Sequence, residues 1–247
     1  MIKAIVFDVD DTLYNQEPSF NAAFRSVFNA DIDNELLKQL YMNYQKQFYL
    51  VQAKACQDQL DLTDSEANFH SLHHTFKKFD INGLTKETAD QFEEEFFNNR
   101  ENIQLADGLS TIFNQLSTKF KLGIITNGTN KDQLSKIMKL KLQHWISRDQ
   151  IITSEDAHAA KPDPLIFTMM NRKFDLRGSE MLYVGSSFDE DIVPAKKAGW
   201  QTVWYNPFNG TISDSSAIPD QTVSNIEELK ELLTELAAER TEKEPEI

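Results

Sequence analysis

The sequence predicts an α/β protein with a doubly wound, Rossmann-like parallel sheet that is interrupted by a helical insert. Three observations lead to this prediction: short apolar runs that end in small or polar residues, amphipathic stretches between those runs, and a long segment without strand patterns. The apolar runs do not alternate cleanly with polar residues, which is typical of strands buried on both faces of a parallel sheet. Strands that alternate with helices along the chain indicate a doubly wound domain.

The predicted strands are short and mostly rich in isoleucine and valine. They cover residues 2–7, 122–125, 150–153, 181–184 and 202–205. Helical spacing of apolar residues predicts helices between these strands and after the last of them. These helices cover residues 109–116, 131–142 and 189–198, and a final one starts near residue 225.

Residues 15–100 contain no convincing strand and hold 10 of the 17 phenylalanines. Phe20, Phe24 and Phe28 recur at a spacing of four with polar residues between them, which indicates amphipathic helices. We therefore expect a helical insert after the first strand. Its phenylalanines are expected to form the core of a helix bundle rather than to line a substrate pocket.

Composition and charge restrict the partners of the protein. The 247 residues include 39 Asp and Glu against 25 Lys and Arg, which gives a formal net charge of −14 at pH 7. This acidity argues against a nucleic acid polymer or an anionic membrane as a partner, because both need a basic surface. No apolar run reaches the roughly 18–20 residues that cross a bilayer. The chain starts without a signal-peptide pattern and Cys56 is its single cysteine, so we expect a cytoplasmic protein.

Two carboxylates follow the first predicted strand, at Asp8 and Asp10. Carboxylates next to a buried strand are costly unless something uses their charge. A divalent cation would use it, since Mg²⁺ prefers oxygen ligands and often takes one or two carboxylates. A carboxylate beside the cation can attack phosphorus, and a second one can act as general acid and base. For this motif alone, a surface turn with solvated carboxylates is an equal alternative.

Polar groups also follow the second and third predicted strands. Thr126, Asn127 and Gly128 supply a hydroxyl, a side-chain amide and backbone N–H groups, which can hold phosphoryl oxygens at a helix N-terminus. Lys161 supplies a point charge for a phosphoryl group or a nucleophile. Taken singly, these residues also fit an ordinary turn and a solvated lysine. Ligands of open α/β sheets bind outside the carboxyl ends of the strands, where all of these residues are expected.

The order of these motifs resembles the haloacid dehalogenase superfamily of aspartate-nucleophile hydrolases. Its first three motifs are matched by Asp8, Asp10 and Thr12, then by Thr126, and then by Lys161 with Pro162. Its fourth motif, an acidic one after a strand, is matched in part by residues 184–191. The resemblance spans residues 1 to about 205 and implies a hydrolase core of residues 1–14 and 101–247. Residues 15–100 then resemble the helical cap of subfamily I.

The resemblance also implies a reaction and residue roles. The protein would be a Mg²⁺-dependent phosphatase that hydrolyses a small phosphorylated metabolite, a phosphomonoester, through an aspartyl-phosphate. Asp8 would be the nucleophile and a Mg²⁺ ligand, and Asp10 would be general acid and base with its backbone carbonyl on Mg²⁺. Thr126 and Asn127, with Gly128, would bind the phosphoryl group. Lys161 would stabilise Asp8 and the charge of the transferred group.

The fourth motif departs from the pattern of the family's phosphatases. Ser186 stands where they usually carry an aspartate that binds Mg²⁺ directly, and the later acidic position is matched by Asp191. We expect Asp191 to be a metal ligand, with Asp189 as a further candidate. Because Ser186 offers a neutral oxygen, we also expect weaker Mg²⁺ affinity.

This departure keeps two alternatives open. Ser186 and Ser187 resemble the fourth motif of the haloacid dehalogenases, which act on 2-haloacids without a metal. Asp10 argues against that chemistry, because those dehalogenases lack the second aspartate of the first motif. The other alternative is a binding or regulatory protein that keeps the fold with impaired catalysis.

Overall fold

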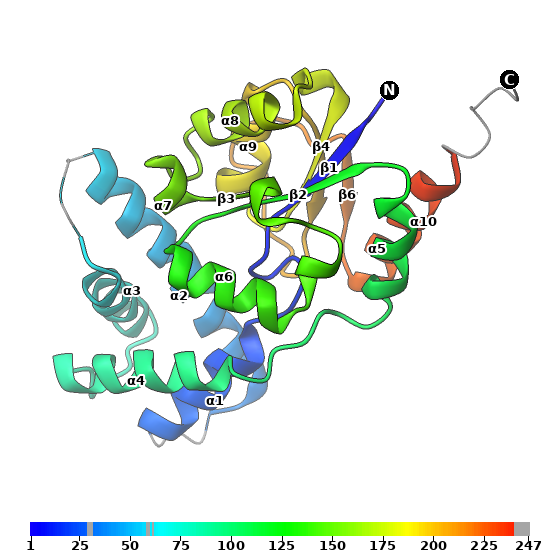
Figure 1. Cartoon of the computed structure of the whole chain (residues 1–247). Helices are drawn as coiled ribbons and strands as arrows, with labels where there is room; N and C mark the ends of the chain where they lie inside the picture. The colour runs from blue at the N-terminus through cyan, green and yellow to red at the C-terminus, as the bar shows by residue number, and fades with distance from the viewer. Residues whose placement is uncertain (29–31, 58–59, 61, 240–247) are drawn as a thin grey trace, which may run out of the picture. The chain divides into compact units, whose positions relative to one another are not determined.

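A computed structural model describes residues 1–28, 32–57, 60 and 62–239. The chain divides into two compact units (Figure 1). The first comprises Met1–Asn15 and Ile103–Ile247, and the second comprises Gln16–Asn102. The boundaries predicted from the sequence fall between residues 14 and 15 and between residues 100 and 101.

The first unit contains a parallel sheet. Among the described residues this sheet has six strands in the order β3-β2-β1-β4-β5-β6. The strands are β1 (Ala4–Phe7), β2 (Lys121–Thr126), β3 (Ile151–Thr153), β4 (Met181–Gly185), β5 (Gln201–Tyr205) and β6 (Gln221–Val223). The central strand β1 pairs with β2 on one side and β4 on the other, so that Ile5 lies beside Leu122 and Leu182. This arrangement confirms the predicted α/β class.

Every strand predicted from the sequence is present, but β6 was not predicted. β6 is three residues long and lies at the edge of the sheet, where only Val223 is buried. A segment with one buried side chain produces no apolar run, so its pattern is that of a loop.

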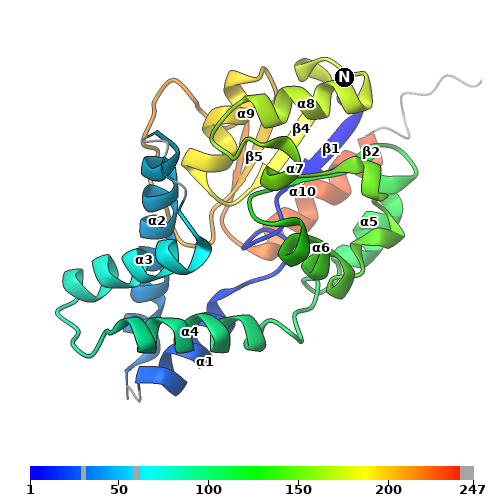
Figure 2. The ribbon, with the colours of Figure 1, turned by 60° about the vertical axis from the view of Figure 1, so that its left-hand side comes forward.

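Helices of the first unit cover both faces of the sheet, and Figure 2 shows α8 and α9 on one face with α5, α6 and α10 on the other. Successive side chains of β1 point to opposite faces, so Ile5 and Phe7 pack in one core while Ala4 and Val6 pack in the other. The helices are α5 (Leu109–Ser117), α6 (Asn130–Lys139), α7 (Ser154–Ala157), α8 (Leu165–Phe174), α9 (Val193–Lys197) and α10 (Ile226–Glu239).

Two predicted helices differ from the observed ones. The helix expected over residues 131–142 ends at Lys139, and a 3₁₀ turn, Leu142–His144, follows it. The helix expected over residues 189–198 is a π-helical turn, Phe188–Ile192, that continues into α9. The α8 helix was not predicted.

In its described part, the second unit contains helices joined by loops and has no strand. It contains α1 (Glu17–Phe28), α2 (Asn34–Gln57), α3 (Asp64–Lys78) and α4 (Lys86–Asn99). The Phe20 ring lies at its centre, with ring centroids 5.2 Å from Tyr41, 5.2 Å from Tyr44 and 5.3 Å from Phe92. The phenylalanines therefore form a bundle core, as the sequence predicted. No helix in the described part of the chain is both long enough and apolar enough to span a bilayer.

Candidate functional site

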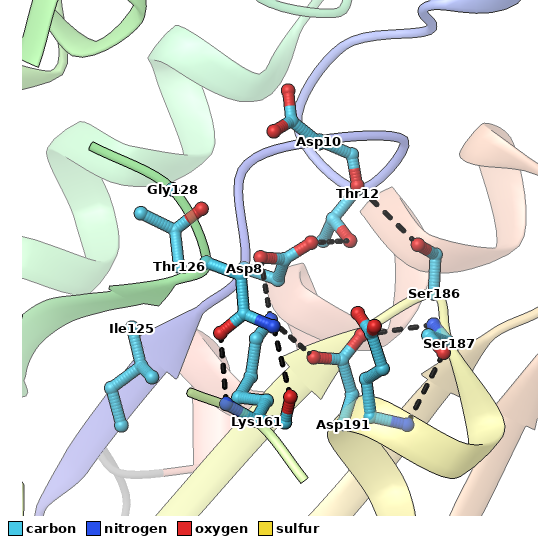
Figure 3. A network of polar contacts seen from close by, with 12 residues as sticks. Asp8, Asp10, Thr12, Ile125, Thr126, Gly128, Lys161, Ser186, Ser187 and Asp191 are labelled. Carbon is cyan, nitrogen blue, oxygen red and sulfur yellow. Dashed lines mark hydrogen bonds and ion pairs between the residues drawn. The ribbon is translucent and has the colours of Figure 1, made fainter. Parts of the chain in front are cut away.

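The predicted site residues meet where β2, β1 and β4, which are neighbours in the sheet, come to an end (Figure 3). Asp8 directly follows β1, Thr126 is the last residue of β2, and Ser186 directly follows β4. The Asp8 N–H donates to the Val184 carbonyl at 3.0 Å, which holds the start of the first motif against β4. The parallel sheet thus brings together residues that are more than a hundred positions apart in the sequence.

Lys161 lies between two buried carboxylates. Its ammonium nitrogen is 2.8 Å from Asp8 Oδ1 and 2.6 Å from Asp191 Oδ1, and its side chain is 2% exposed. The ammonium also donates to the Tyr183 hydroxyl at 3.2 Å, and that hydroxyl donates to the Ile125 carbonyl at 2.9 Å. When both carboxylates are ionised, they and the single ammonium give this buried group one net negative charge.

The pKa values of these groups reflect their burial. Burial raises the pKa of Asp8 from 3.8 to about 7, although the neighbouring Lys161 acts to lower it. Burial acts to lower the pKa of Lys161, but Asp191 and Asp8 together hold it well above its usual range. Lys161 is therefore a permanent cation beside Asp8, and it favours the charged, nucleophilic form of that carboxylate.

Asp10 faces away from Asp8, as Figure 3 shows. Tyr14 donates its hydroxyl to Asp10 Oδ1 at 2.5 Å, and two residues of α6 donate to Oδ2: Gln133 at 3.2 Å and Lys136 at 2.8 Å. The backbone carbonyl of Asp10 points instead toward the fourth motif and accepts from the Ser186 hydroxyl at 3.4 Å.

The groups predicted to hold a phosphoryl group have protein partners. Thr126 donates its hydroxyl to Gln133 Oε1 at 3.1 Å. Asn127 donates its amide to the Lys161 carbonyl at 3.0 Å and accepts from the Lys161 N–H at 2.8 Å, so its side chain fixes the loop that carries the lysine. The Gly128 N–H donates to Ser154 Oγ at 2.9 Å. The contact of these residues with a phosphoryl group stays a prediction.

Asp191 has a different environment from the one expected of a metal ligand. Besides Lys161, its Oδ1 lies 3.2 Å from the Tyr183 hydroxyl oxygen, and its Oδ2 accepts from the Ser187 N–H at 2.9 Å. Protein donors thus occupy both oxygens, and the contact with Lys161 was not predicted. Asp189 accepts a hydrogen bond from Ser213. Metal binding by either aspartate stays a prediction.

The oxygen atoms available for a cation are hard donors of mixed charge. They come from the Asp8 carboxylate, the Asp10 carbonyl and the Ser186 hydroxyl, the last two 3.4 Å apart. Within the described ranges, no cluster of at least three His, Cys, Asp or Glu side chains has the arrangement of a metal site. Mg²⁺ takes oxygen ligands, needs only one or two carboxylates and keeps several waters. The donor set therefore fits Mg²⁺, with one charge fewer than an aspartate at position 186 would supply.

Besides Tyr14, which donates to Asp10, three residues of the site were missed in the sequence. Tyr183 lies within the apolar run of β4, where a tyrosine looks like an ordinary core residue. Gln133 and Lys136 lie on the buried face of α6 beside Ile137. A buried lysine on the apolar stripe of a helix is a usable signal, because it requires a partner charge.

Known proteins share sequence similarity and the fold with this chain. Residues 5–205 match the model of a family described as haloacid dehalogenase-like hydrolase. The chain is 26% identical to a glyceraldehyde 3-phosphate phosphatase of Methanocaldococcus jannaschii, over 96% of this chain and 99% of that protein. It is 25% identical to a ribulose-1,5-bisphosphate 5-phosphatase of Halopiger xanaduensis, over 95% and 100%. The fold is shared with the magnesium-bound HAD-hydrolase YfnB of Bacillus subtilis, with a TM-score of 0.70, 23% identity and coverage of 94% and 98%.

Proposed function

Because the chain belongs to the haloacid dehalogenase-like hydrolases, we propose that it is a Mg²⁺-dependent phosphatase that hydrolyses a small phosphomonoester. The observation that carries this proposal is the buried pair of Asp8 and Lys161, with the second carboxylate, Asp10, two residues further along. The relatives named as phosphatases of small phosphorylated sugars support a substrate of that class.

The first half of the reaction transfers the phosphoryl group to Asp8. Lys161 holds Asp8 Oδ1 at 2.8 Å, so Oδ2, which accepts a long 3.4 Å bond from Thr12, is the oxygen that attacks phosphorus. The bond between phosphorus and the ester oxygen breaks, and that oxygen takes a proton from the Asp10 carboxyl group. The products are an aspartyl-phosphate and a free alcohol.

The second half of the reaction releases phosphate. A water molecule attacks phosphorus, its proton passes to the Asp10 carboxylate, and the bond between phosphorus and Asp8 Oδ2 breaks. Asp10, which takes part in both halves of the reaction, accepts hydrogen bonds from Tyr14 and Lys136.

Two further groups stabilise the charge on the phosphoryl group. Lys161 supplies one buried positive charge. Mg²⁺, when bound, neutralises phosphoryl oxygens, and Asp8, the Asp10 carbonyl and Ser186 are the residues that would hold it.

We also propose that the helical unit Gln16–Asn102 is the cap of a subfamily I enzyme. A helical insert between the first and second motifs supports this assignment. A cytoplasmic location is a further proposal, and it rests on the single cysteine, which cannot form an internal disulfide.

The test is hydrolysis of p-nitrophenyl phosphate and of a panel of small phosphorylated metabolites, with Mg²⁺ and with a chelator. We expect turnover that Mg²⁺ stimulates and that Asp8→Asn abolishes. Asp107→Asn, which changes an exposed carboxylate, is the matched control and should be as active as the parent. Turnover without any response to Mg²⁺, or an active Asp8→Asn variant, contradicts the proposal.

Ser186 and Ser187 favour a second candidate, a metal-independent 2-haloacid dehalogenase. Halide release from 2-haloacids in the presence of a chelator would establish that activity. Specific binding of a phosphate ester without hydrolysis would instead indicate a binding or regulatory protein of the same fold.

A further inference from the structure

The α6 residues Gln133 and Lys136 contact the Asp10 carboxylate, but the reaction described above gives neither a chemical step. They lie three positions apart, which places them on the same face of the helix. Both are buried, with exposed fractions of 2% and 4%. Both donate to the same oxygen, Asp10 Oδ2, at 3.2 and 2.8 Å.

The burial of Lys136 is costly unless its charge is used. An ammonium group out of water requires a compensating carboxylate, and this one lies 2.8 Å from Asp10 Oδ2 and 2.9 Å from Asp132 Oδ2. An apolar side chain at position 136 would pack beside the buried Ile137 without that cost. The charge of this buried lysine is therefore compensated by two carboxylates, and one of them is Asp10.

Gln133 joins Asp10 to the end of β2. Its Nε2 donates to Asp10 Oδ2, and its Oε1 accepts from the Thr126 hydroxyl at 3.1 Å. This orientation of the amide is fixed by chemistry, because an ionised carboxylate can only accept a hydrogen bond. One side chain therefore sets the position of the second aspartate relative to the second motif.

We propose that Gln133 and Lys136 are positioning residues that hold the Asp10 carboxyl group in place for its proton transfers. The proposal rests on the proposed phosphatase function. With Tyr14 bound to Oδ1 and the α6 pair bound to Oδ2, both oxygens of Asp10 are tethered. Asp10 gives its proton to the ester oxygen as the bond from that oxygen to phosphorus breaks, and it takes a proton from water in the second step. Misplacement of such a group by about 1 Å costs on the order of 100-fold in rate.

A comparison of leaving groups separates positioning from a merely structural role. p-Nitrophenolate departs without protonation, whereas the alkoxide of benzyl phosphate requires a proton from Asp10 as it departs. The ratio of kcat/KM for benzyl phosphate to kcat/KM for p-nitrophenyl phosphate therefore reports how well Asp10 delivers its proton. General damage to the fold or to phosphoryl binding lowers both values and leaves their ratio unchanged.

The experiment measures this ratio for the parent, Lys136→Met and Gln133→Leu, with Mg²⁺ present. We expect both variants to lower the ratio by about tenfold or more, which is part of the roughly 100- to 10,000-fold that general acid catalysis contributes. Lys131→Met replaces an exposed lysine of the same helix and should leave the ratio unchanged. Lys136→Gln keeps a hydrogen-bond donor without the charge and should lower the ratio by a smaller factor. This variant replaces Lys136→Met in the experiment if the methionine variant does not fold.

An equal loss on both substrates, or an unchanged ratio, overturns the proposal while the phosphatase function stands. A parent protein that hydrolyses neither ester overturns both, so the two failures are distinguishable.

Discussion

Replacement of Lys161 by methionine tests how strongly the buried triad of Asp8, Lys161 and Asp191 contributes to the fold. The ammonium lies 2.8 Å from Asp8 and 2.6 Å from Asp191, and the three side chains are 2%, 9% and 1% exposed in the order Lys161, Asp8, Asp191. Methionine has a similar length without a charge, so the substitution leaves two buried carboxylates facing each other. Removal of one partner of a buried ion pair costs about 3–5 kcal/mol. We expect a loss of that size in the free energy of unfolding at neutral pH.

The effect should depend on pH with a definite sign. The pKa of Lys161 is raised above its unfolded value of 10.5, so its contribution is fully present below that pH. In the variant, the pKa of Asp8 should rise further above about 7, because the lowering effect of Lys161 is gone. A carboxyl group with a raised pKa binds more protons when folded, so both proteins lose stability through Asp8 as pH rises from 3.8 to about 7, and only the variant continues to lose it above about 7. The deficit should therefore be larger at pH 8 than at about pH 5.

The assay is urea unfolding of both proteins at several pH values, followed by far-UV circular dichroism, with a chelator and without phosphate. Lys196→Met is the matched control, because Lys196 lies 2.9 Å from Asp220 but the side chains are 27% and 40% exposed. That exposed pair should contribute less than about 1 kcal/mol. A Lys161→Met deficit no larger than that of the control, or one that shrinks as pH rises, refutes the reasoning.

Three further predictions concern the fourth motif and its surroundings. Ser186→Asp should lower the Kd for Mg²⁺ by at least about tenfold, because it adds a charged ligand at that position. An unchanged Kd in isothermal titration calorimetry would show that residue 186 does not contact the metal. Gly185→Ala should destabilise the fold by about 1–3 kcal/mol, because a Cβ there would lie 2.5 Å from the buried Asp191 Cγ; an unchanged urea midpoint would contradict this. A hydrogen bond from Lys3, with one from the Arg177 N–H, lowers the pKa of Glu180 from 4.5 to about 2. The stability that these hydrogen bonds provide is present above pH 4.5 and is lost as pH falls toward about 2. The difference in free energy of unfolding between the parent and Glu180→Gln should therefore shrink over that interval. A difference that stays constant would refute this prediction.

The sheet could be predicted because its strands are buried on both faces. Residues 4–7 and 181–185 are buried at every position, and such runs stand out against the polar segments around them. β6 could not be predicted, because two of its three side chains are exposed. The helix predicted over residues 189–198 begins as a π-helical turn, and its aspartates and glutamate do not distinguish that turn from an ordinary surface helix.

The site was predictable only in part, for a related reason. Asp8, Asp10, Thr126 and Lys161 follow strand ends, and the topology of a parallel sheet brings such positions together. The partners of these residues depend on helix packing that local patterns do not encode. Lys136 lies 126 positions from the carboxylate that it contacts, and only the assembled sheet and α6 bring the two together.

The insertion of the second unit also affects the route by which the sheet forms. β1 cannot pair until β2, beginning at Lys121, has reached it, so a long chain must close before the central strands meet. The Ser19 hydroxyl donates to the Asn99 carbonyl at 3.2 Å, which joins the first and last helices of the second unit. Once that unit has folded, its ends are close together. The number of unfolded residues that connect β1 to β2 then falls to roughly a quarter of the full connection. Each halving of a loop saves roughly 0.6 kcal/mol of closure entropy, so prior folding of the insert should ease the central pairing by about 1 kcal/mol.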